Sequence, residues 1–128
     1  MTISLERVGS FTSEIGAEIA AYDAQRALLY VVSGGTVLEV LDLSNPSAPA
    51  QVAAIDIAEF GAPVGGANSV AFKNGLLAVA LAAENQTDNG VVALVNIDQA
   101  IAGQSAGQSA GEDLLDAVKV FTVGALPD

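Results

Sequence analysis

The sequence predicts an all-β fold. A segment that begins at Gly16 is repeated from Gly66, and a third start appears at Gly124. Each repeat contains four short runs rich in Val, Leu and Ile, separated by turn residues, which is the pattern of strands. Four antiparallel strands in a repeat of about 45–50 residues are typical of a β-propeller blade. We therefore expect a partial β-propeller, with two four-stranded antiparallel blades plus one extra outer strand.

The chain divides into consecutive parts of one domain, 1–128. The extra strand is expected at 3–11, which resembles the fourth run of each repeat and would be the outer strand of a preceding blade. The first blade is expected at 14–57 and the second at 66–123. Residues 124–128 would begin a third. A Gly-Gln-Ser-Ala repeat at 103–111 cannot pack a core, so we expect a flexible insertion within the second blade.

The two repeats align without gaps inside the strands. Residues 16–22 align with 66–72, 28–31 with 76–79, 37–43 with 91–97 and 52–55 with 118–121. The turns between the runs contain Gly34-Gly35 and Asn74-Gly75, pairs that tolerate the positive φ of tight hairpins. Helix is expected only in a short stretch, near 97–101 or 112–116.

Several strands are apolar on both faces, which favours sheets stacked between neighbours over sheets with one face in water. We therefore expect a core that lies largely between the two blades. Its predicted members are Leu29, Val31, Val37, Val40, Leu41, Val70, Phe72, Leu77, Val79, Val92 and Leu94.

Composition limits the function. The 128 residues include 4 basic and 15 acidic side chains, a net charge of −11, so the surface should repel nucleic acid and anionic membranes. The chain contains no Cys and no His. It therefore cannot supply a thiolate metal site, a Ser-His-Asp triad or an imidazole base. No run approaches the roughly 18 apolar residues of a membrane span, and residues 1–7 do not form a signal peptide.

Glu18 and Asn68 are candidate ligand contacts. They occupy equivalent places at the start of the innermost strand of each blade, which lines the central channel of a propeller. There they would contact a ligand or Ca²⁺, or else cap the exposed end of the strand.

Glu84, Asn85 and Asp88, with Asn89, gather oxygen donors in one hairpin loop. Oxygen donors suit Ca²⁺, although the spacing does not match an EF-hand loop. The alternative is a polar turn. No cofactor other than Ca²⁺ is suggested.

Residues 16–19, 41–46 and 68–76 closely resemble the choice-of-anchor I domain, and the Asp42–Pro46 run also resembles LVIVD-type and YVTN-type propeller repeats. The resemblance implies a β-propeller of secreted or surface-attached bacterial proteins, with an extracellular, periplasmic or cell-surface location. Relatives carry names such as alkaline phosphatase-like and mesenchyme-specific cell surface glycoprotein-like. The resemblance supplies no catalytic residues.

Two functions remain open. The first is a non-catalytic structural or interaction module, whose partners would be the remaining blades of a longer parent chain or further copies of itself. The alternative is a fragment of a Ca²⁺-dependent phosphatase-like, phytase-like or esterase-like propeller enzyme. No catalysis is expected of this chain alone.

Overall fold

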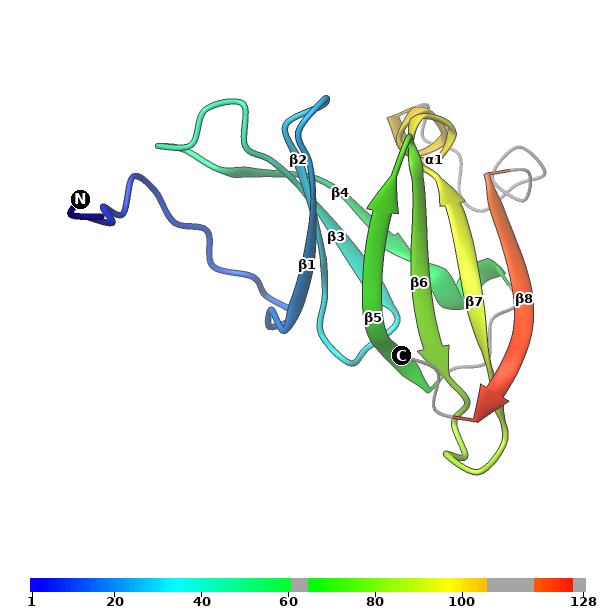
Figure 1. Ribbon diagram of the computed structural model, residues 1–128. Coiled ribbons are helices and arrows are strands. Elements are labelled where there is room, and N and C mark those ends of the chain that lie inside the picture. Colours follow the sequence, from blue (N-terminus) through cyan, green and yellow to red (C-terminus); the bar gives the residue numbers. More distant parts are fainter. Residues whose placement is uncertain (61–64, 106–116, 126–128) are drawn as a thin grey trace.

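The computed structural model describes residues 1–60, 65–105 and 117–125, and it is nearly all β. Its strands form two four-stranded antiparallel sheets, each in sequence order (Figure 1). The first sheet contains β1 (Ile19–Asp23), β2 (Leu28–Val32), β3 (Val37–Asp42) and β4 (Ala50–Asp56). The second contains β5 (Gly66–Lys73), β6 (Leu76–Ala82), β7 (Asn89–Asn96) and β8 (Val118–Ala125). Two propeller-like blades are therefore confirmed.

Local sequence explains the turns. The β5–β6 turn contains Asn74 at φ 51° and Gly75 at φ 82°, the left-handed pair that a two-residue hairpin requires. After β3, the Asp42 carboxylate accepts a hydrogen bond from the Ser44 amide at 2.7 Å and turns the chain. A short 3₁₀ turn, η1 (Ile57–Phe60), follows β4, and one helix, α1 (Ile97–Ser105), follows β7.

The strand register shows that the second sheet repeats the first position by position. Leu28 pairs with Asp42 in the first sheet, and Leu76 pairs with Asn96 in the second. The counterparts of Leu29, Val31, Glu39 and Leu41 are therefore Leu77, Val79, Ala93 and Val95. On the outer strands, Ala53 corresponds to Lys119 and Ile55 to Phe121.

The main core lies between the two sheets, whose inner strands β1 and β5 run side by side (Figure 1). The first sheet buries one face there, and the second sheet buries the opposite face. The contributing side chains include Tyr30, Val32, Leu38, Val40, Ala53 and Ile55 from the first sheet, and Leu77, Val79, Leu81, Val91, Ala93 and Val95 from the second.

Each sheet consequently has a second face that points away from the other sheet. We call these the outer face of the first sheet, which carries Tyr22, Leu29, Val31, Glu39 and Leu41, and the outer face of the second sheet. The latter carries Lys73, Leu76, Ala78, Ala80, Leu94, Lys119 and Phe121.

The core prediction was right for six residues and less so for five. Val31, Val40, Leu41, Val70, Leu77 and Val79 are buried, whereas Leu29, Val37, Phe72, Val92 and Leu94 are only half-buried. Four of these five, all but Phe72, lie on an outer face, because side chains alternate between the two faces of a strand.

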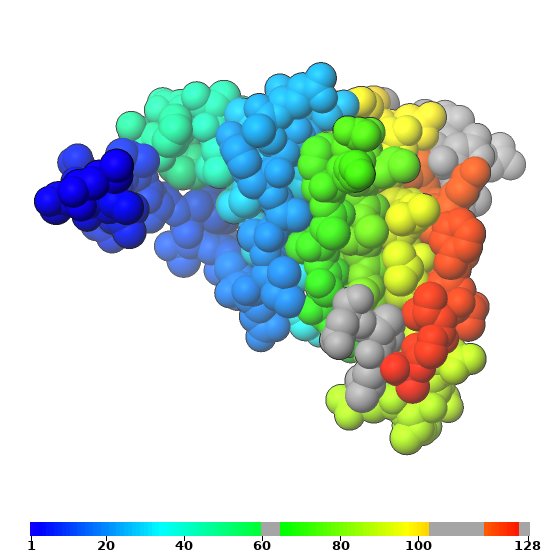
Figure 2. Space-filling view, viewed as in Figure 1, coloured from blue at the N-terminus to red at the C-terminus, as the bar shows by residue number. Residues whose placement is uncertain are grey.

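The strand expected at 3–11 does not form: these residues make no ladder, and the N-terminal end of the segment protrudes from the body (Figure 2). Ile3, Leu5 and Val8 are 82%, 97% and 64% exposed. A strand exists only beside a hydrogen-bonded neighbour, and the described residues place none next to this segment.

The helix expected near 97–101 is confirmed as α1, which also includes residues 103–105, where an insertion loop had been expected. The rest of that insertion, the alternative helix at 112–116 and most of the third start lie outside the described residues. Among the described residues, no helix is long and apolar enough to cross a membrane.

Candidate functional site

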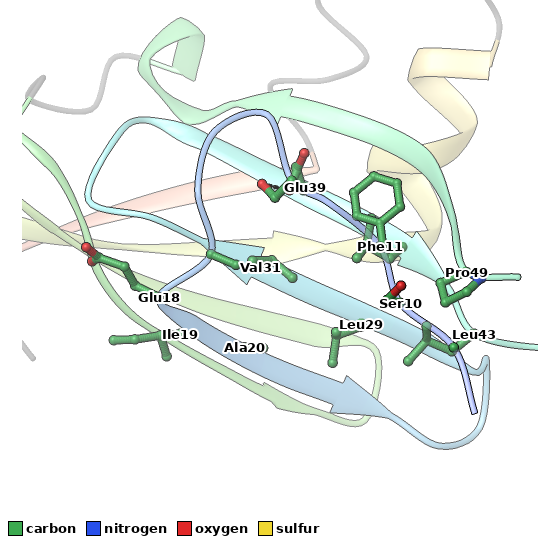
Figure 3. A pocket seen from close by; sticks show the side chains of 14 residues that line it. Ser10, Phe11, Glu18, Ile19, Ala20, Leu29, Val31, Glu39, Leu43 and Pro49 are labelled. Atoms are coloured by element: carbon green, nitrogen blue, oxygen red, sulfur yellow. Dashed lines mark hydrogen bonds between the residues drawn. The ribbon is translucent and has the colours of Figure 1, made fainter. Parts of the chain in front are cut away.

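An open pocket of about 320 Å³ lies on the outer face of the first sheet (Figure 3). Its floor is formed by Leu29, Val31 and Leu41. Residues 9–18, which we call the N-terminal strap, pass over one side of it and place Phe11 against the pocket. The strap is held where Gly9 packs on the backbone of Pro46, an approach that leaves no room for a Cβ.

Glu39 gives this pocket its chemistry. It is a charged residue in the middle of β3, between the apolar residues Leu38 and Val40, and yet it is only 2% exposed. Its Oε2 accepts a hydrogen bond from the Ser13 hydroxyl of the strap at 2.6 Å, and Ser13 Oγ in turn accepts one from the Ile15 amide at 3.3 Å. A buried carboxylate is stabilised by hydrogen-bond donors and cations, so the pocket favours a group that supplies one of these.

Glu18 also lines the pocket, at the end opposite Leu43 and Pro49 (Figure 3). It precedes β1, its amide donates a hydrogen bond to the Val32 carbonyl at 3.1 Å, and its side chain is exposed. Its carboxylate lies beside Gly34, since a Cβ on that glycine would be 3.7 Å from Glu18 Oε2.

Asn68, the counterpart of Glu18, lies at a bulge in β5 and is half-buried. The β2–β3 turn lies against the start of β5: the Ala67 amide donates to the Gly35 carbonyl at 2.8 Å, and a Cβ on Gly66 would overlap the Gly34 carbonyl. Glu18 and the beginning of β5 thus share one neighbour, the Gly34-Gly35 turn. Whether Glu18 and Asn68 bind a ligand stays a prediction.

Glu84, Asn85 and Asp88 lie on the exposed loop between β6 and β7. Asn85 Oδ1 accepts a hydrogen bond from the Thr87 hydroxyl at 3.1 Å, and the Asp88 amide donates to the Asn85 carbonyl at 2.9 Å. These bonds have the geometry of a polar turn. Within the described parts of the chain, no three acidic side chains gather closely enough to hold a metal ion. A calcium site here stays a prediction.

A charged cluster joins the two sheets, and sequence reasoning missed it. Arg26, in the β1–β2 turn, donates to Asp98 of α1 through Nε at 2.9 Å and through a terminal nitrogen at 2.8 Å. A second terminal nitrogen donates to Asp23 at 3.1 Å, and the Tyr30 hydroxyl donates to the same Asp23 oxygen at 3.2 Å. Arg26 and Asp98 are distant in sequence, so no local pattern could have paired them.

The cluster shifts the pKa values of its members. Burial raises the pKa of Asp23, but hydrogen bonds from Arg26, Gln25 and Tyr30 outweigh it, so that this pKa lies below its usual range. Hydrogen bonds from Arg26 lower the pKa of Asp98, and both carboxylates raise the pKa of Arg26. Burial, followed by the charge of Asp23, raises the pKa of Tyr30. At neutral pH Arg26, Asp23 and Asp98 are therefore charged while Tyr30 keeps its proton, and the cluster acts as a clamp between the sheets.

The geometry supports binding more readily than catalysis. Ser13 and Glu39 form the closest hydroxyl–carboxylate pair at the pocket, but the chain has no imidazole to activate the hydroxyl. What the pocket does offer is an apolar floor with a buried acceptor, on a face that a neighbouring sheet could cover.

Comparison with known protein families gives a match over most of the chain. The family model described as the choice-of-anchor I domain matches residues 18–128. No curated protein and no solved structure is significantly similar to the chain. The match covers both sheets, and it agrees with the resemblance seen in the sequence.

Proposed function

Because the chain belongs to the choice-of-anchor I domain family, whose members are surface-associated bacterial modules, we propose that it is a non-catalytic structural module of such a protein. In this proposal it supplies two consecutive blades of a β-propeller and packs on further blades through its two outer faces. The pocket above Glu39 is then part of a face that another blade covers.

The observation that carries the proposal is the equivalence of buried and outer faces. The outer face of the first sheet uses the same repeat positions as the face that the second sheet buries in the core. The outer face of the second sheet likewise uses the positions that the first sheet buries there. Each outer face therefore has the strand positions and spacing of a surface that, elsewhere in the same molecule, packs against a sheet.

The aromatic residues show how far the equivalence extends. Phe72 packs against Tyr30 of the other sheet, with ring centroids 5.3 Å apart and an interplanar angle of 35°. Its counterpart in the first sheet is Tyr22, which is 53% exposed. Tyr22 thus has the repeat position of an aromatic residue that packs on a neighbouring blade.

Binding of the dye 8-anilinonaphthalene-1-sulfonate tests whether the outer faces are adhesive. In dilute solution the folded chain should bind the dye, and Tyr22→Ser and Phe121→Ser should each weaken binding. The matched control, Leu5→Ser, removes an exposed apolar side chain that lies on neither face and should leave binding unchanged. A monomeric chain that binds no dye would contradict the proposal, because its faces would then need no cover.

The rival function is hydrolysis, tested with a chromogenic phosphate ester with and without Ca²⁺. We expect no turnover under either condition, because the chain supplies neither a thiolate nor an imidazole base. Turnover that is lost on Glu18→Ala or Glu39→Gln would overturn the non-catalytic assignment.

A further inference from the structure

We propose that the outer face of the first sheet binds the outer face of the second sheet of another copy of this chain, and that Lys119 of one copy pairs with Glu39 of the other. The inference rests on the proposed function, since it names the partner of the face that a blade would cover. Such a contact is head to tail. Each copy binds one neighbour through the outer face of its first sheet and another neighbour through the outer face of its second sheet.

Charge is distributed unevenly between the two outer faces. The chain has only 4 basic residues, and both of its lysines lie on the outer face of the second sheet. Lys73 pairs with Leu76 across the β5–β6 ladder, and Lys119 pairs with Leu94 across the β7–β8 ladder; both lysines are exposed. The pocket on the outer face of the first sheet carries Glu18 and Glu39 instead. The two faces are thus complementary in sign.

The repeat places one lysine and one glutamate at interface positions. Ala53 and Ala93, 6% and 0% exposed, both belong to the core between the two sheets. Their counterparts on the outer faces are Lys119 and Glu39. Where the internal contact has two alanines, a contact between copies would have a lysine on one side and a glutamate on the other.

Replacing the two alanines by a charged pair would give Glu39 a cationic partner. Glu39 is 2% exposed, and the Ser13 hydroxyl that donates to it is neutral. An ammonium group would add a charge-assisted interaction that a hydroxyl cannot supply. A charged pair within an otherwise apolar contact also fixes register, because any other alignment leaves both charges unpaired.

Apolar side chains surround the proposed pair. Leu76 and Phe121 are 48% and 51% exposed on the outer face of the second sheet, and Tyr22 is 53% exposed on the outer face of the first. The counterparts of Leu76 and Phe121 in the first sheet are Leu28 and Ile55, which pack in or against the internal core. The contact between copies would cover these exposed side chains as the internal contact covers their counterparts.

The test is sedimentation equilibrium of the full chain with two charge-reversal variants. Lys119→Glu changes an exposed residue and should fold normally, yet weaken self-association by more than about tenfold. Glu39→Lys should also weaken it. An equimolar mixture of the two should associate again, because each contact between a copy of one variant and a copy of the other joins a lysine to a glutamate. Circular dichroism verifies that both variants are folded.

The matched control replaces Glu39→Lys by Glu84→Lys, which gives the same net charge but places the lysine on the exposed β6–β7 loop. Because Glu84→Lys leaves both Glu39 and Lys119 in place, it should associate alone as the wild-type chain does, whereas Glu39→Lys should not. If Glu39→Lys does not fold, Glu39→Gln is used in its place. Glu39→Gln should associate with itself more weakly than the wild-type chain does.

The outcomes separate this inference from the proposed function. Association that Lys119→Glu weakens supports both. About 100 μM is well above the dissociation constant of a contact of moderate affinity. If the chain stays monomeric at this concentration while its faces bind the dye, a second copy is not the partner. That result favours blades of another polypeptide. Association that Lys119→Glu and Phe121→Ser leave unchanged places the contact elsewhere and also overturns the inference.

Discussion

Leu77 and Leu76 are adjacent in β6 but point to opposite faces, which makes them a sharp test of where the core lies. Leu77 is 0% exposed between the two sheets, whereas Leu76 is 48% exposed on the outer face of the second sheet. The same substitution to Ala at each position removes the same atoms from two environments. Strand propensity and position in the ladder are nearly identical for the two residues.

The expected magnitude for Leu77→Ala follows from its burial. The change removes three carbon atoms from the core, and a buried methylene contributes about 0.8 kcal/mol, so transfer alone costs about 2.4 kcal/mol. The unfilled cavity adds to this, because neighbouring strands relax only partly. We therefore expect the free energy of unfolding to fall by about 3 to 4 kcal/mol, and the melting temperature by about 10 °C.

The assay is urea unfolding followed by circular dichroism, at about 1 μM so that association between copies contributes least. Leu76→Ala should cost less than about 1 kcal/mol under these conditions. Equal losses for the two variants, or a larger loss for Leu76→Ala, would show that the faces of β6 have been assigned the wrong way round and would refute the reasoning from strand register.

Two further predictions concern the contacts between the sheets. Gly66→Ala should destabilise the chain more than Gly16→Ala in thermal melts: both glycines have positive φ, but only at Gly66 would the new methyl group meet a facing carbonyl. Equal losses would mean that the turn and β5 are not packed as described. Arg26→Met should make acid unfolding begin at a higher pH. The folded pKa of Asp23 lies below its unfolded value of 3.8, so Asp23 contributes stability that is present above that value and lost as pH falls through the folded pKa. Removing the guanidinium raises that folded pKa, and an unchanged acid midpoint would argue against the clamp.

Much of the fold could be predicted because the signals are local and repeated. The alignment of residues 28–31 with 76–79 coincides with the strand register, and Asn74-Gly75 forms the turn that its composition predicts. The strand at 3–11 was predicted from its resemblance to the fourth run of each repeat. It is absent, because pairing depends on a neighbour and not on the segment itself.

The candidate site was less predictable. The ion pair between Arg26 and Asp98 and the hydrogen bond between Ser13 and Glu39 join residues distant in sequence, and no periodic pattern reports such contacts. The sequence did contain one signal. Glu39 interrupts the apolar run of β3, whose other charged residue, Asp42, is its last. A charge at the centre of a strand that is apolar on both sides indicates a buried acceptor or an interface.

The contact between Gly66 and Gly34 has a consequence for the size of any ring built from this repeat. In a closed ring the angle between neighbouring sheets, multiplied by the number of sheets, must make one full turn. Here the backbones of the β2–β3 turn and of β5 touch near the inner strands without an intervening side chain. A methyl group at this point would push the inner edges apart and reduce the angle between the sheets. More sheets would then be needed for one turn, around a wider channel, so a single glycine helps to set how many blades can close.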